Sequence, residues 1–176
     1  MFEHVAAATA LACVAGAAYA DIRHFEIPDG WSVAIAALFV VFAFVAPPVE
    51  PWWAHVAAGA GVFFIGALLF SRGWLGGGDV KLLAACALWA GFLGLPLLLL
   101  GTAFAGGVLA LLAVVGRMLA TPAVTYRGLQ RDGPLPYAVA ILGGAILLAT
   151  MPSFTEPAVA QASARYSAPT PKTAPS

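Results

Sequence analysis

The chain has 176 residues, of which 62% are hydrophobic and 9% are charged, and its mean hydropathy is +0.94. Soluble domains carry about 25% charged residues, so this composition excludes a soluble globular protein and indicates an integral membrane protein. The formal net charge is zero, which gives no reason to expect a nucleic acid or an anionic surface as partner.

Apolar stretches along the chain predict the architecture. A spanning helix needs about 20 mostly apolar residues, fewer where neighbours shield its ends. Six stretches come close to this length: 3–20, 31–48, 53–71, 80–93, 96–116 and 137–151. The fourth and fifth are separated only by Gly94-Leu95-Pro96, so they form either a helical hairpin or one kinked span. A single helix over both would be about 55 Å long against a hydrocarbon core of about 30 Å, which favours the hairpin. We therefore expect an all-α, polytopic bundle of about six transmembrane helices.

Basic residues are distributed unequally between the loops of this arrangement. The second and fourth loops hold no Lys or Arg, whereas the first, third and fifth hold Arg23, Arg72, Lys81, Arg117, Arg127 and Arg131. By the positive-inside rule, the odd-numbered loops face the cytoplasm and both termini lie outside. We expect residues 1–151 to form one transmembrane domain. The stretch 152–176 is rich in Pro, Ala, Ser and Thr, which predicts a disordered tail.

Two aspartates stand out among the eight acidic residues. Asp21 directly follows the first apolar stretch and Asp79 begins the fourth, so both lie at the predicted cytoplasmic edge of the membrane. Two carboxylates held close together can share a proton, because like charges a few Å apart cannot both ionise. The ionised partner then acts as general base on a water and the protonated partner as general acid. Simpler roles stay open: Asp79 could cap the next helix, and Asp21 could be solvated at the interface.

The surroundings of Asp79 suggest contact with a substrate. Gly76, Gly77 and Gly78 precede it, and glycine permits the close backbone approach that an extended peptide beside the carboxylate requires. Lys81 follows, and we take it with the three glycines as a candidate for substrate binding. The chain has no CxxC pair and no histidines at ligand spacing, so we expect neither a metal nor another cofactor.

Two segments resemble the motifs of a known family, the type IV prepilin peptidases. The segment from Asp21 to Asp29 resembles their first aspartate motif, in which a hydrophobic-Pro pair, here Ile27-Pro28, follows six residues after the aspartate. The segment Gly76-Gly77-Gly78-Asp79 resembles their GxGD motif, and its trailing Lys and Leu are present. Pro136-Tyr137-Ala138-Val139-Ala140 is similar to a third family segment. The resemblance covers nearly all of residues 1–151.

The resemblance implies an aspartic-type intramembrane endopeptidase with Asp21 and Asp79 as catalytic residues and no metal. Such enzymes lie in the bacterial inner membrane and cut the basic leader from prepilins on the cytoplasmic side, with pilus-assembly proteins as further partners. Nothing in the chain matches the cysteine-containing segment of long, methylating members. It is therefore similar to the short CpaA/TadV-like form that serves Flp/Tad pili.

A non-enzymatic alternative stays open, namely a small transporter or a structural subunit of a pilus or secretion assembly. In that case the two aspartates would bind a cation or proton, or would cap helices. Carboxylates of ion pathways usually lie near the middle of the bilayer, whereas both aspartates here lie at its predicted edge. Their position favours the peptidase.

Overall fold

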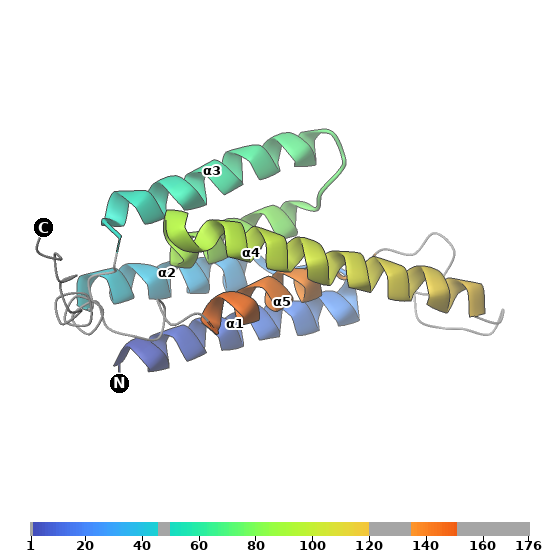
Figure 1. Ribbon diagram of the computed structural model, residues 1–176, viewed down its shortest axis with the longest axis horizontal. Helices are drawn as coiled ribbons and strands as arrows, with labels where there is room; N and C mark the ends of the chain where they lie inside the picture. Colours follow the sequence, from blue (N-terminus) through green and yellow to red (C-terminus); the bar gives the residue numbers. More distant parts are fainter. Residues whose placement is uncertain (1, 46–49, 120–134, 151–176) are drawn as a thin grey trace, which may run out of the picture.

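The apolar stretches fold into α-helices, because a backbone in lipid must satisfy its N–H and C=O groups within its own segment. The computed structural model describes residues 2–45, 50–119 and 135–150. In these ranges it has no strand, and its helices are α1 (Phe2–His24), α2 (Asp29–Val45), α3 (Trp52–Ser71), α4 (Gly77–Leu119) and α5 (Tyr137–Ala149) (Figure 1). Helices α1, α3 and α4 are long and apolar enough to cross a membrane, and α2 and α5 are shorter apolar helices. The predicted all-α membrane helix bundle is confirmed. The count of six crossings stays a prediction, and the predicted tail at 152–176 lies outside the described residues.

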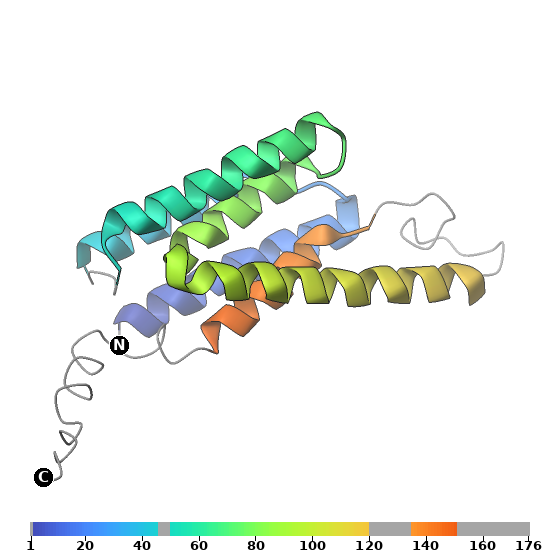
Figure 2. The same cartoon turned by 45° about the horizontal axis from the view of Figure 1, so that its top comes forward.

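Helix α4 reverses direction at Gly91. This glycine has φ 61° and ψ −170°, a conformation that interrupts the helix and that L side chains rarely adopt. The chain then runs back beside its first part, so α4 consists of a first arm, 77–90, and a second arm, 92–119 (Figure 2). The predicted hairpin is confirmed, but its predicted position at Gly94-Leu95-Pro96 is wrong. Pro96 lies inside the second arm.

The reversal is stabilised by side chains from the first turn of α3 and from the residues just before it. The His55 Nδ1–H donates to the Leu88 carbonyl at 2.8 Å, at the end of the first arm. The Glu50 carboxylate accepts from the Leu93 N–H at 3.2 Å, at the start of the second arm. A Cβ on residue 91 would collide with both the Glu50 carboxylate and the His55 ring. Gly91 is therefore required both for its conformation and because the Glu50 and His55 side chains approach it closely.

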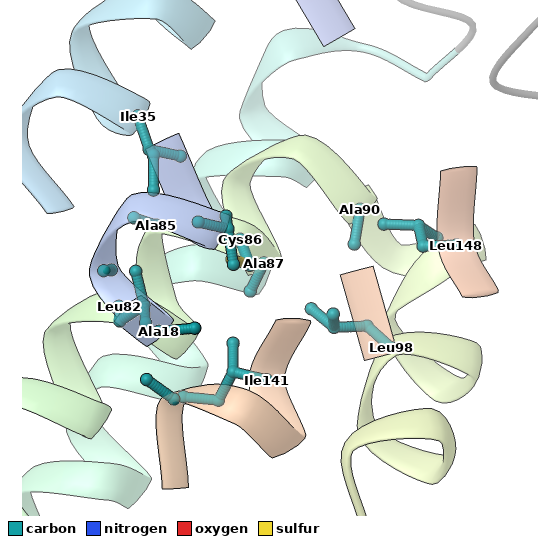
Figure 3. Packing of buried hydrophobic residues seen from close by; sticks show 13 residues of the cluster. Ala18, Ile35, Leu82, Ala85, Cys86, Ala87, Ala90, Leu98, Ile141 and Leu148 are labelled. Atoms are coloured by element: carbon teal, nitrogen blue, oxygen red, sulfur yellow. The ribbon is translucent and has the colours of Figure 1, made fainter. Parts of the chain in front are cut away.

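Small residues let the helices pack closely, as expected for helix association in lipid. Gly101 of the second arm faces Gly144 of α5, and a Cβ on Gly101 would lie 2.9 Å from the Gly144 Cα. The first arm of α4 lies at the centre of the buried cluster, where Leu82 is fully buried. Figure 3 shows its side chains meeting those of α1, α2, α5 and the second arm; the labelled residues are Ala18, Ile35, Leu82, Ala85, Cys86, Ala87, Ala90, Leu98, Ile141 and Leu148.

Five helix ends lie at the same end of the bundle. There α1 and α3 finish, and α2, α4 and α5 begin (Figures 1 and 2). Asp21 lies in the last turns of α1, and Asp79 lies in the first turn of α4. The fold therefore carries both motif aspartates to the same end of the molecule, although 57 positions separate them in the sequence (79 − 21 − 1).

Candidate active site

Asp21 is a buried carboxylate that caps another helix. Its side chain is 6% exposed, and its Oδ2 accepts a hydrogen bond from the Ala138 N–H at 2.9 Å. Helix α5 begins at Tyr137, and its own N-cap residue, Pro136, makes no side-chain cap. The first N–H groups of a helix lack partners within it and favour a negative charge, so Asp21 supplies the cap that the sequence of α5 lacks. The simpler role for Asp21, solvation at the interface, is wrong because the side chain is buried.

Asp79 is the third residue of α4 and is partly buried. The Gly76 N–H, just before the helix, donates to its carboxylate. This is the reciprocal half of a capping box, in which an acidic side chain in the first turn satisfies the N–H before the helix. The capping role considered for Asp79 is therefore present. It does not exclude catalysis, because a carboxylate that accepts one hydrogen bond keeps further lone pairs for a water.

The two carboxylates act on each other electrostatically. Asp21 lies in the last turns of α1 and Asp79 in the first turn of α4, at the same end of the bundle, where a negative charge on Asp21 disfavours one on Asp79. Each also faces a helix N-terminus, α5 for Asp21 and α4 for Asp79. Two carboxylates a few Å apart can hold one proton between them and can exchange it with a bound water. The structure thus places the two residues that the sequence selected at the same end of the bundle, while their catalytic role stays a prediction.

Close packing explains two of the three glycines before Asp79. A Cβ on Gly78 would lie 3.0 Å from the Ile27 Cβ, and a Cβ on Gly76 would lie 2.5 Å from the Asp79 Oδ2. Ile27 belongs to the segment that follows Asp21, so the two motifs touch directly at Gly78. Phe25, in the same segment, has φ 54°, a left-handed conformation that non-glycine residues rarely adopt and that ends α1 abruptly. The predicted contact of Gly76, Gly77 and Gly78 with substrate stays a prediction beside this packing role.

Lys81 has a partner within the protein. Its Nζ lies 2.7 Å from both carboxylate oxygens of Asp29, the first residue of α2. Both side chains are largely exposed, 46% for Lys81 and 64% for Asp29. Exposed ion pairs are worth about 0–1 kcal/mol, so a binding partner can break this one at low cost. The predicted role of Lys81 in substrate binding stays open.

Sequence reasoning missed the backbone contribution of α5. Ala138 carries no functional side chain, and only its N–H reaches Asp21. The available signals were the Pro136-Tyr137 start of a helix without a capping side chain and the likeness of 136–140 to a family segment. Among the described residues, no group of three His, Cys, Asp or Glu side chains is arranged to hold a metal ion.

The chain is similar in sequence to known proteins of one family. A family model described as the type IV leader peptidase family matches residues 8–111, which include Asp21 and Asp79. The "Prepilin leader peptidase/N-methyltransferase" of Bacillus subtilis (strain 168) is 33% identical over 132 residues, which make up 74% of this chain and 49% of that protein. The chain thus spans about half the length of this curated relative. No solved structure matches the chain.

Proposed function

The chain belongs to the type IV leader peptidase family, and on this premise we propose that it is a prepilin peptidase that uses Asp21 and Asp79 as its catalytic pair. The observation that carries the proposal is that the end of α1, which holds Asp21, and the start of α4, which holds Asp79, lie at the same end of a membrane helix bundle. The substrate would be a prepilin, and we propose one of the Flp/Tad type.

In the proposed reaction a water lies between the two carboxylates. The ionised aspartate takes a proton from this water as its oxygen bonds to the scissile carbonyl carbon, and the protonated aspartate donates to the carbonyl oxygen. The tetrahedral gem-diol then collapses: the aspartate that took the proton of the water passes it to the leaving nitrogen, the C–N bond breaks, and the other aspartate takes back a proton from a hydroxyl of the gem-diol. The products are a leader with a new carboxyl group and a pilin with a new N-terminal amine, and the pair again holds one proton.

The N-terminus of α4 would stabilise the developing negative charge. The N–H groups of Gly77 and Gly78 belong to the first turn of α4, where no partner exists within the helix. Neither residue has a side chain to obstruct a peptide, so both are candidate donors to the oxyanion. This assigns the predicted substrate contact of the glycines to their backbone.

We further propose that the site faces the cytoplasm. The Lys and Arg residues of the described ranges are Arg23, Arg72, Lys81 and Arg117. They lie near the ends of α1 and α3 and near the two ends of α4, and these four helix ends point toward the same side of the bundle (Figure 1). Positive charge marks the cytoplasmic side of membrane proteins, which supports this orientation. Arg127 and Arg131 lie outside the described residues.

The decisive experiment is processing of a co-expressed Flp-type prepilin by Asp79→Asn. Asn keeps the shape and capping ability of Asp but cannot exchange a proton, so mature pilin should disappear while the protein still accumulates in the membrane. Glu26→Gln is the matched control, because Glu26 is an exposed carboxylate in the loop after α1, and it should cost far less. Near-normal cleavage by Asp79→Asn would leave Asp79 as a helix cap only and would end the enzymatic proposal.

A further inference from the structure

A lateral groove lies between α2 and α3. Both helices pack along α4, but they make few contacts with each other. The space between them is an open, largely apolar groove of about 500 Å³. Small residues, Gly59, Ala60, Ala84 and Ala85 among them, line it together with bulky, exposed residues such as Val33 and Phe64. Small residues within a bulky rim let another helix approach closely in lipid.

The groove leads toward the candidate active site. Lys81 and Asp29, which form the ion pair, belong to its lining. On α4 the lining residues are Lys81, Ala84, Ala85 and Leu88, which lie on one face of the helix and begin two residues after Asp79. Seven steps along a helix measure about 10 Å, so the groove has room for about two turns of a docked helix.

One residue of the groove lining carries a buried hydroxyl without a partner among the described residues. Ser32 is 7% exposed, its Oγ forms no hydrogen bond within the described part of the chain, and it belongs to the groove lining. An unpaired buried hydroxyl is costly, so a bound helix that supplied a donor to it would be favoured. An acyl chain has no donor or acceptor to offer. The first N–H groups of a helix lack partners within that helix, and a serine oxygen is among their preferred caps.

We infer that the groove receives the N-terminal end of the substrate's apolar helix, with Ser32 capping that helix across the interface. Ser32 follows Asp29 by three positions on α2, so the capped end lies near the Asp29–Lys81 pair and the extended segment before it reaches Asp79. Asp21 already caps α5 in the same manner from another helix. This inference rests on the proposed function and adds to it the surface that holds the substrate.

Groove-filling and cap-removing variants test the inference in detergent with purified prepilin. Ala60→Phe places a ring in the groove from an exposed position, and Ala57→Phe makes the same change at an exposed position of α3 outside the lining. Ala60→Phe should raise the apparent KM about tenfold with kcat little changed, and Ala57→Phe should not. Ser32→Ala should also raise KM, although removing an unpaired hydroxyl leaves stability unchanged or improved. Unchanged KM in both Ala60→Phe and Ser32→Ala would overturn the inference.

Photo-crosslinking separates this inference from the proposed function. A photoreactive phenylalanine analogue at position 60 or 57, in an Asp79→Asn background that holds uncleaved substrate, is irradiated in membranes with co-expressed prepilin. Crosslinks to the apolar segment of prepilin from position 60 and not from 57 support the groove. Crosslinks only to lipid or to a second copy of this chain, or equal capture from both positions, overturn it. If the groove inference is overturned in this way but wild-type protein still cleaves prepilin, the proposed function stands without the groove. If wild-type protein does not cleave prepilin, the proposed function itself is refuted.

Discussion

Replacing Asp21 by Asn or by Ala should separate its capping role from its proposed catalytic role. In the structure its Oδ2 accepts the Ala138 N–H at 2.9 Å, and the side chain is buried. Asn keeps an acceptor at this position and is as good a cap as Asp, so the free energy of unfolding should change by less than about 1 kcal/mol. Ala leaves a buried N–H without a partner, which should cost about 1–3 kcal/mol.

Activity should respond differently from stability. Neither Asn nor Ala can exchange a proton with a water, so both variants should lose about 10²–10⁴-fold in cleavage rate, the usual contribution of general acid–base catalysis. Two measurements are needed on the same membranes: the rate of prepilin cleavage, and the unfolding of the protein in increasing denaturing detergent. An Asp21→Asn variant that is as stable as the wild type but inactive supports the catalytic pair. If it cleaves at a near-normal rate, Asp21 is a cap for α5 and the mechanism is refuted.

Three further perturbations follow from the geometry. Gly78→Ala should push the two aspartate motifs apart, because its Cβ would lie 3.0 Å from that of Ile27. It should lower activity, and overpacking should lower the free energy of unfolding by about 1–3 kcal/mol. Gly61→Ala, where a Cβ meets nothing within 4 Å, is the control in the same denaturation assay. Gly91→Ala should reduce the amount of folded protein in the membrane far more than Gly61→Ala, since it combines a positive φ with a collision against Glu50 and His55; equal amounts would contradict the account of the reversal. Cleavage in detergent should survive a strong chelator, and a loss of activity on chelation that added metal restores would contradict a mechanism of two carboxylates alone. The cleavage rate should also pass through a maximum with pH, because it falls when both aspartates are protonated or both are ionised.

The helices themselves could be predicted from the sequence because the bilayer allows few alternatives. A long apolar run in lipid must become a helix that satisfies its own backbone, so each predicted stretch corresponds to a helix or to an arm of α4. The two aspartates could be chosen for a similar reason, since a carboxylate beside a spanning segment is costly and needs an explanation. Local composition carries both kinds of information, and no knowledge of the partners of a residue is required.

Tertiary structure decided what depends on residues far apart in the chain. The reversal in α4 lies at Gly91 and not at the expected Gly94-Leu95-Pro96, because the side chains that stabilise it come from elsewhere in the chain: Glu50 lies just before α3 and His55 lies in its first turn. The site depends in the same way on packing, because Asp21 finds its N–H donor in Ala138, 117 positions further along. No local pattern around Asp21 encodes that contact. It arises only when α1 and α5 pack side by side and bring the end of one helix to the start of the other.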